Sequence, residues 1–233
     1  MIWLASYPRS GNTYIRIILH EVYGIKSSEY HQEKKIKLNP KYQSFPVVKT
    51  HLLPSQLKSN QNDIPSIYLV RDGRDALVSL AHHKKDFYDK KTNFLDNLHE
   101  AILAEEGSYF GGWGKHVQEW SSRASVIIHF EDLIANPILS IDKMRPFIDL
   151  PQARRSAPNF QDLRTKRFKY GRGWKKNREK FFRRGVSGAW KDEMPDDLQQ
   201  LFWKLHGDSM VSLGYTTGIF EMLERSRNNK LST

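Results

Sequence analysis

The sequence predicts an α/β fold of three layers, in which helices flank a central parallel sheet of about five strands. Short apolar runs that are typical of buried parallel strands alternate with segments of helical periodicity. A turn rich in proline, serine and glycine connects the first such run to a helical pattern, as in βα units. The chain has 233 residues, a size that one hydrophobic core can serve, so we expect a single domain over residues 1–233.

The composition is that of a globular protein. Apolar residues make up 39% of the chain and charged residues 27%, so there are enough side chains to bury and disorder throughout is not expected. Cysteine is absent from the sequence. This excludes a disulfide framework and any thiolate that acts as a nucleophile or metal ligand.

The N-terminal elements are predicted from short apolar runs. Residues 2–6 predict a buried strand and residues 7–12 a turn, and the isoleucines that follow predict a helix. Residues 24–45 are polar, rich in lysine and without a clear period, so we expect an irregular loop there. The second and third strands are expected at residues 45–49 and 66–70.

The later elements continue the alternation. A helix is expected from Asp72 to about Lys84, with Asp72 or Gly73 near its start. The further expected elements are helices at about 93–106 and 113–121, a strand at 126–130, a helix from 136 to about 147 and a helix at 195–213. Strands that alternate with helices imply a parallel sheet with right-handed crossovers.

Two segments depart from this pattern. Between residues 164 and 190, lysine and arginine crowd the chain, glycines interrupt it and little apolar periodicity remains. We expect a basic loop there that is mobile when empty and becomes ordered when a cofactor binds. The last residues, about 224–233, are polar, so we expect a frayed terminus.

The net charge of the chain indicates which kinds of molecule it is expected to bind. The formal net charge is +11, which favours anions such as nucleotides, acidic glycans, nucleic acids or lipid headgroups, although a solvated basic surface also explains it. The sequence contains no secretory signal, and no apolar run reaches the roughly 18 residues that a membrane span needs. We therefore expect a cytoplasmic protein without a membrane span.

The segment at residues 7–13, Tyr-Pro-Arg-Ser-Gly-Asn-Thr, is the first candidate for chemistry. Between a strand and a helix, backbone N–H groups and the helix dipole converge on one point, which is a geometry that binds phosphate. Gly11 would let the backbone approach the anion, and Arg9 would supply charge. Ser10 and Thr13 would donate from their hydroxyls. Ordinary turn chemistry before a helix is the alternative interpretation.

A nucleoside triphosphate loop is absent from the sequence. The pattern G-x-x-x-x-G-K-[ST] does not occur anywhere in the chain. An ATPase or kinase of that type is therefore disfavoured.

Segments from about residue 2 to residue 215 resemble, in order and spacing, the cytosolic-type sulfotransferases that use 3'-phosphoadenosine 5'-phosphosulfate (PAPS). That family has a five-stranded parallel sheet flanked by helices and is related to the P-loop nucleotide kinases. The segments that carry the resemblance are 7–14 (YPRSGNTY), 48–54 (VKTHLLP), 68–79 (YLVRDGRDALVS), 112–120 (GWGKHVQEW), 129–133 (HFEDL) and 181–191 (FFRRGVSGAWK).

The resemblance implies an enzyme that moves a sulfuryl group from PAPS to a hydroxyl or amine and releases 3',5'-ADP. It makes His51 the general base, a role that suits an imidazole because this group titrates near neutrality. Arg9 and Lys49 would stabilise charge on the leaving phosphate and on the sulfuryl oxygens. An ordinary polar residue after a strand is the alternative interpretation of His51.

The resemblance also implies the residues that bind the cofactor. The 5'-phosphosulfate side would comprise Arg9, Ser10, Gly11, Asn12 and Thr13, with the ring of Tyr14 against adenine. The 3'-phosphate side would comprise Arg71 and Ser79, with Arg183, Arg184 and Gly185 closing over them and Phe130 nearby.

Three positions depart from the family pattern. Most relatives carry lysine where Arg9 stands, and an arginine stabilises charge but does not donate a proton. Tyr14 replaces a tryptophan that stacks on adenine, and Phe130 stands where many relatives have a tyrosine. Plain core packing is the alternative interpretation of both rings.

The sequence predicts no metal site. His82, His83 and His116 lack a partner set at the spacing of metal ligands, so we interpret them as surface or core histidines. Glu131 and Asp132 are expected at a helix start, where acidic side chains are favourable, and no catalytic role is assigned to them.

Two other functions are also compatible with the sequence. Lys and Arg residues interleaved with aromatic residues at 166–176 would suit a nucleic-acid-binding protein. That interpretation explains the basic loop but not His51, and nucleic acid is not the partner that we expect. A nucleotide or small-molecule kinase on a related fold is the second alternative. For a sulfotransferase, we expect a small-molecule or glycan acceptor. Basic residues near the site would suit an anionic acceptor, and binding of the cofactor explains them equally well. The sequence carries no signal for oligomeric state.

Overall fold

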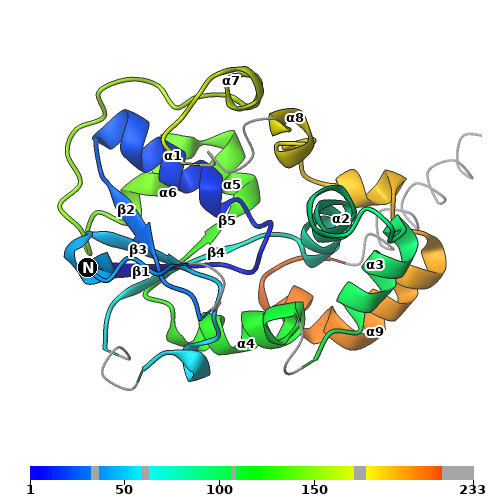
Figure 1. Ribbon diagram of the computed structural model, residues 1–233. Coiled ribbons are helices and arrows are strands. Elements are labelled where there is room, and N and C mark those ends of the chain that lie inside the picture. Colours follow the sequence, from blue (N-terminus) through cyan, green and yellow to red (C-terminus); the bar gives the residue numbers. More distant parts are fainter. Residues whose placement is uncertain (33–36, 59–62, 106–108, 171–176, 217–233) are drawn as a thin grey trace, which may run out of the picture.

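Five parallel strands form the centre of the structure. The structure is a computed structural model, and it describes residues 1–32, 37–58, 63–105, 109–170 and 177–216 (Figure 1). The strands lie in the order β2-β3-β1-β4-β5, and every neighbouring pair is parallel. Their bounds are Ile2–Ala5 (β1), Ser27–Glu29 (β2), Val47–Thr50 (β3), Ser66–Val70 (β4) and Val126–His129 (β5). The predicted fold class is therefore confirmed.

Helices cover both faces of the sheet and its carboxyl end (Figure 1). Helices α1, α5 and α6 lie over one face and α4 over the other, while α2, α3 and α9 lie beyond the carboxyl ends of the strands. The helices are Asn12–Tyr23 (α1), Gly73–His83 (α2), Phe94–Ile102 (α3), Trp113–Arg123 (α4), Phe130–Ala135 (α5), Pro137–Asp142 (α6), Phe160–Thr165 (α7), Arg178–Phe181 (α8) and Asp196–Ser212 (α9). None of the helices in these described ranges is both long and apolar enough to cross a bilayer.

Alternation along the strands divides the core into two layers. Ile2 and Leu4 pack against side chains of α1, α5 and α6, whereas Trp3 and Ala5 pack against those of α2, α3, α4 and α9. Successive side chains of a strand point to opposite faces, so a strand buried on both faces is apolar throughout. This is why four residues suffice to make β1 recognisable in the sequence.

Strand β2 corrects one expectation. Residues 24–45 were expected to form an irregular loop, but Ser27–Glu29 adds a strand to the edge of the sheet, and a short 3₁₀ helix spans Tyr42–Ser44. The sequence Ser-Ser-Glu has no apolar pattern. Its strand conformation depends on pairing with β3 and on Tyr170, whose hydroxyl accepts from Ser27 N at 2.6 Å and donates to Ser27 O at 3.0 Å.

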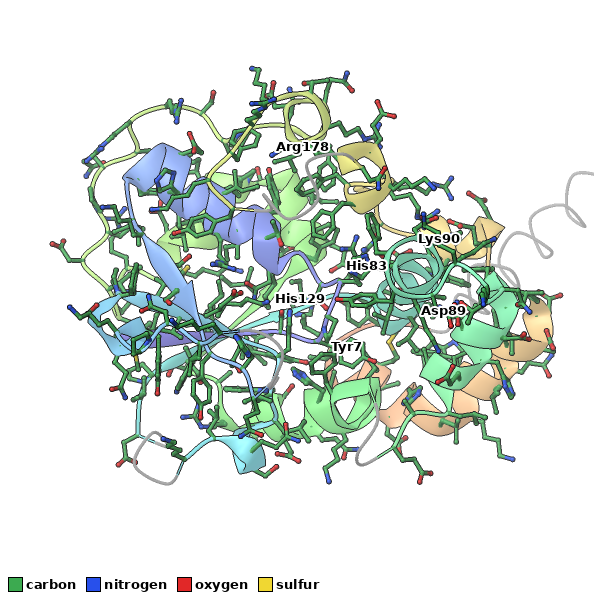
Figure 2. The ribbon with its side chains drawn as sticks, viewed as in Figure 1. Tyr7, His83, Asp89, Lys90, His129 and Arg178 are labelled. Carbon is green, nitrogen blue, oxygen red and sulfur yellow. The ribbon has the colours of Figure 1, made fainter. Side chains whose placement is uncertain are left out.

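The segment expected to be a basic loop is partly helical. Within residues 164–190 the structure contains the end of α7, all of α8 and the start of a 3₁₀ helix at Ala189–Asp192. Arg178, labelled in Figure 2, supports α8 because its Nη1 donates to the carbonyl of Leu163 at 3.1 Å. Residues 171–176 and the tail at 224–233, which was expected to be frayed, lie outside the described residues.

Two helices are shorter than the sequence predicts. The helix expected at 93–106 ends at Ile102, and the helix expected to reach about 147 ends at Asp142 and continues as turns. Pro146 lies within the second of these expected helices, and a proline lacks the N–H group of a helical hydrogen bond and disfavours helix at the residue before it, so the earlier end is consistent with the sequence.

Candidate active site

One cleft of about 960 Å³ opens at the carboxyl ends of β1, β3 and β4. Ligands of open α/β sheets bind at this edge, because the loops that follow the strands converge there. Of the residues that the sequence assigns to a site, all but Ser10 line the cleft: Arg9, Gly11, Asn12, Thr13, Tyr14, Lys49, His51, Arg71, Ser79, Phe130, Arg183, Arg184 and Gly185.

The turn between β1 and α1 has the backbone geometry of an anion site. Gly11 is the N-cap of α1 with φ +98°, and neither a side-chain cap nor an acidic residue satisfies the first turn of the helix. Arg9 also has a positive φ of +68°, which is uncommon for a residue with a side chain. The N-terminal amides of α1 and the positive end of its dipole therefore lie at the cleft, and the first turn of this helix contributes no carboxylate of its own.

Two polar side chains of this turn have different environments. The Oγ atom of Ser10 is buried and has no hydrogen-bond partner in the structure, which is costly unless a ligand accepts from it. Asn12, in contrast, donates from Nδ2 to the carbonyl of Leu4 at 3.2 Å and to Oγ of Ser6 at 3.0 Å. The side chain of Asn12 thus fastens the turn to β1.

Arg9 projects from the turn toward α2 and toward residues 181–191, which are called the late segment below. Its Nε donates to Oγ of Ser79 at 3.2 Å, its Nη2 donates to the carbonyl of Phe181 at 2.6 Å, and the guanidinium lies 4.4 Å from the centre of the Phe181 ring. Burial and then repulsion from Arg71 and Arg183 lower the pKa of Arg9 to about 9. A bound anion would relieve this concentration of positive charge.

Arg71 follows β4 and is almost fully buried. Its Nη1 donates to the carbonyl of Arg9 at 3.3 Å and its Nη2 to that of Val186 at 3.1 Å. Nη2 also lies 3.7 Å from Oδ2 of Asp75, and the guanidinium lies over the ring of Phe130. Its Nε is buried without a partner in the structure. Burial lowers the pKa of Arg71, although the Asp75 carboxylate opposes this effect.

These contacts join two anion pockets that the sequence predicts separately. One pocket is the turn that contains Arg9, and the other surrounds Arg71 and Ser79. Arg9 contacts both residues of the second pocket, through its carbonyl and through its Nε. The two groups of residues are therefore adjacent within one cleft.

His51 follows β3 and is oriented by the first turn. Its Nδ1 lies 2.6 Å from the carbonyl of Ser6, so this nitrogen carries the proton of the neutral ring and Nε2 keeps the lone pair. Burial, then the charge of Lys49, lowers the pKa of His51 well below its usual range, although the bond to Ser6 raises it. The imidazole is thus neutral near pH 7 and has the form that accepts a proton.

Lys49 lies near two charged residues that the sequence did not single out. Its Nζ is 3.5 Å from Oε2 of Glu29, and Nη1 of Arg16 is 3.6 Å from the same oxygen. All three side chains line the cleft. Glu29 keeps a lowered pKa despite burial, because both cations favour its charged form. Since Glu29 lies on β2, which the sequence does not reveal, its place in the site was missed.

Aromatic rings line the cleft beside the turn. The hydroxyl of Tyr14 donates to the carbonyl of Pro158 at 3.1 Å, and its ring lies 5.5 Å from that of Phe160. Burial raises the pKa of Tyr14 to about 12. Phe130 is buried between Gly11 and Arg71, and a Cβ at Gly11 would lie 2.5 Å from its ring. Phe130 therefore requires a glycine at the turn.

The late segment brings Arg183, Arg184 and Gly185 to the same cleft. Arg183 donates from Nη1 to both carboxylate oxygens of Glu193 at 2.7 Å, and Arg184 donates to Glu193 and to Asp192. Gly185 has φ +65°, and a Cβ there would lie 2.0 Å from the ring of Phe160.

Two further histidines, His116 and His83, are buried. His116 is buried, and its Nδ1 lies 3.0 Å from the Tyr68 hydroxyl; burial lowers its pKa to about 3. His83, labelled with Tyr7 in Figure 2, lines the cleft, and burial likewise lowers its pKa to about 3. Within the described ranges, no group of three or more His, Asp or Glu side chains is arranged to hold a metal ion.

Glu131 lies at the start of α5, as expected, but its carboxylate contacts groups outside that helix. Its carboxylate accepts from Asp72 N at 3.1 Å and from the hydroxyl of Tyr215 at 2.9 Å. It therefore fixes the loop after β4, on which Arg71 lies.

Comparisons with known proteins identify the family of this chain. The profile of the family described as "Sulfotransferase domain" matches residues 1–214. "Sulfotransferase 1 family member D1" of Mus musculus is 24% identical over 239 residues, which cover 82% of this chain and 77% of the relative. "Luciferin sulfotransferase" of Photinus pyralis is 23% identical over 253 residues, covering 84% and 68%. The crystal structure of mouse sulfotransferase SULT7A1 complexed with PAP has a TM-score of 0.69 at 19% identity, covering 90% of this chain and 84% of that one.

Proposed function

Because this chain belongs to the sulfotransferase family and is a sulfotransferase, we propose that its donor is PAPS. In this proposal His51 is the general base, and Arg9 and Lys49 stabilise the transferred charge. The observation that carries the proposal is the contact of Arg9 with both Arg71 and Ser79 in one cleft. A donor with a 5'-phosphosulfate and a 3'-phosphate needs two such anion sites side by side.

The donor lies along the cleft with its two anionic ends apart. The 5'-phosphosulfate occupies the N-terminus of α1, where Ser10, Thr13 and the backbone amides donate to it. The 3'-phosphate lies between Arg71 and Ser79, closed over by the late segment. Adenine contacts the ring of Tyr14. The buried unpartnered atoms Ser10 Oγ and Arg71 Nε support this arrangement, because each gains an acceptor when the donor binds.

Transfer proceeds in line. The acceptor oxygen attacks sulfur, the bond between sulfur and the 5'-phosphate oxygen breaks, and the acceptor proton passes to Nε2 of His51. The product 3',5'-ADP leaves. Positioning and electrostatics dominate such a step, since charge spreads over the equatorial oxygens. The Nδ1 bond to Ser6 supports the role of His51, because it directs the lone pair of Nε2 away from the turn.

Arg9 acts only through charge. A guanidinium stays protonated at neutral pH even with the lowered pKa of about 9, so it stabilises the departing phosphate without donating a proton to it. Lys49 precedes His51 by two residues, lines the same cleft and supplies the second cation to the sulfuryl oxygens.

The acceptor is a small molecule that reaches His51 from the β2 side. A pocket of about 200 Å³ lies beside His51, and its lining includes Glu29, Tyr30, Leu52 and Phe110. One ring-sized group fits this volume. The relative named for luciferin supports a small-molecule acceptor. An acidic glycan, which the net charge suggests, finds less support in a pocket with a carboxylate in its wall.

Calorimetry with 3',5'-ADP and with ATP tests the donor. Wild-type protein should bind 3',5'-ADP in the micromolar range or tighter and ATP much more weakly, because only the former carries a 3'-phosphate. Arg71→Ala should lose at least roughly 100-fold in affinity for 3',5'-ADP, since two charge-assisted hydrogen bonds disappear. Arg155→Ala, an exposed arginine outside the cleft, is the matched control.

Three outcomes decide the proposal. Preference for ATP with magnesium would favour the kinase alternative. Salt-dependent binding of oligonucleotides without affinity for 3',5'-ADP would favour the nucleic-acid alternative. Equal binding by wild type and Arg71→Ala, with both folded, would remove Arg71 from the 3'-phosphate site.

A further inference from the structure

A carboxylate outside the cleft holds the arginines of the late segment. Glu193 accepts two hydrogen bonds from Nη1 of Arg183, both at 2.7 Å, and one from Nη1 of Arg184 at 3.0 Å. The side chain of Glu193 is 17% exposed, and the residue does not line the cleft. It therefore acts on a ligand only through the two arginines.

The same carboxylate is anchored to α2. Nε2 of His82 lies 2.6 Å from Oε2 of Glu193, and the His82 ring stacks on that of Phe94 at 4.3 Å. His82 is three residues after Ser79, so the two side chains lie on the same face of α2. Glu193 thus fixes Arg183 relative to the helix that presents Ser79.

Arg183 needs such an anchor because it lies near other cations. Burial is the largest cause that lowers the pKa of Arg9 and of Arg71, and repulsion from Arg183 lowers both further. Without a carboxylate beside it, Arg183 would move away from the cleft toward solvent. Both bonds to Glu193 start from Nη1, so Glu193 does not use the edge of the guanidinium formed by Nε and Nη2. That edge can bind a phosphate through two parallel hydrogen bonds.

We propose that Glu193 is a positioning residue of the donor site, which holds Arg183 beside Arg71 and Ser79 so that its guanidinium binds the 3'-phosphate. This inference rests on the proposed PAPS site. Glu193 determines affinity for the 3'-phosphate specifically and leaves the 5' end of the nucleotide unaffected. Asp192 has no equal role, because its side chain is 66% exposed and its ion pair with Arg184 is screened by solvent.

The experiment compares two nucleotides that differ only in the 3'-phosphate. Calorimetry of Glu193→Gln, which keeps the shape but loses the charge, should give roughly tenfold weaker binding of 3',5'-ADP. Binding of 5'-AMP should stay within about twofold of wild type. Asp192→Asn should leave both affinities unchanged. Thermal unfolding checks that each variant is folded. If Glu193→Gln is unfolded, Glu193→Asp, which keeps the charge, replaces it. The affinity of Glu193→Asp for 3',5'-ADP should lie between that of wild type and a value roughly tenfold weaker.

The outcomes separate this inference from the proposed function. If wild-type protein does not bind 3',5'-ADP, the PAPS assignment fails and this inference with it. If wild type binds and Glu193→Gln binds equally well, only the role of Glu193 is refuted. Equal losses for both nucleotides would mean a general structural role, and tighter binding by Glu193→Gln would mean that the carboxylate competes with the phosphate; both results overturn the proposal.

Discussion

The Nδ1 atom of His51 lies 2.6 Å from the carbonyl of Ser6, so the first turn of the chain orients the ring that follows the third strand. Two segments that are 45 residues apart in sequence thereby fix one tautomer. The nitrogen that remains, Nε2, is the one able to accept a proton. This contact determines what substitutions at His51 should do.

Replacing His51 should abolish transfer and spare donor binding. His51→Ala should lower kcat by roughly 10²- to 10⁴-fold, the usual contribution of a positioned general base. Its dissociation constant for 3',5'-ADP should change by less than about threefold. Turnover is measured with PAPS and a panel of small phenols and alcohols, with the exposed His99→Ala as control. Turnover close to wild type in His51→Ala would remove this residue from the base role.

The sulfotransferase activity should persist at mildly acidic pH. An ordinary histidine loses its basic form as pH falls through about 6.5. Burial and the charge of Lys49 lower the pKa of His51 well below that value, so the neutral ring survives to lower pH. The acid limb of kcat/KM, which reports the free enzyme, should therefore lie below pH 6.5. An acid limb at or above pH 6.5 would mean that another group controls the profile.

Gly185 and Gly188 should respond differently to alanine. Both have left-handed backbones, with φ of +65° and +78°, so a side chain costs about 1–2 kcal/mol at either position. Only at Gly185 would the new Cβ meet another group, the ring of Phe160 at 2.0 Å, whereas nothing lies within 4 Å at Gly188. Gly185→Ala should therefore also weaken 3',5'-ADP binding by roughly tenfold or more.

Calorimetry on the two glycine variants measures this difference directly. Gly188→Ala carries the same backbone penalty and so serves as the matched control. Similar affinities for the two variants would show that Phe160 can shift away from position 185.

Asp75 should contribute to stability through the late segment. Its buried carboxylate accepts from Gly188 N at 2.8 Å and from Trp190 N at 2.9 Å. Asp75→Asn keeps the shape but places an amide donor against one of these N–H groups. The free energy of unfolding should fall by about 2 kcal/mol, measured by urea denaturation. The exposed Asp149→Asn is the control, and a change no larger than the control's would contradict the prediction.

The sequence predicts elements well where local pattern and burial agree. Strand β1 and the turn after it are recognisable because residues 2–5 are apolar on both faces and Gly11 marks the turn. Strand β2 could not be predicted, because Ser27 is held by Tyr170 from 143 residues away. Helix α8 likewise depends on Arg178, which contacts a distant carbonyl. Such long-range contacts leave no local period.

The residues of the candidate site also divide into those with a local sequence signal and those that depend on contacts between distant parts of the chain. The residues that directly follow strands, His51 and Arg71, are identified by motif and position. Glu29 and Glu193 are not, because each acts by pairing with a cation elsewhere in the chain. Acidic residues that balance a basic site are indistinguishable in sequence from solvated surface carboxylates.

The hydroxyl of Tyr170 bonds to both backbone atoms of Ser27, and the Arg16 guanidinium lies 4.4 Å from the centre of its ring. One phenol therefore holds the outer strand of the sheet in place. Glu29 lies on that strand, and Glu29, Arg16 and Tyr170 all line the cleft. Loss of the Tyr170 hydroxyl would thus free three parts of the cleft wall at once, although none of its bonds reaches into the cleft itself.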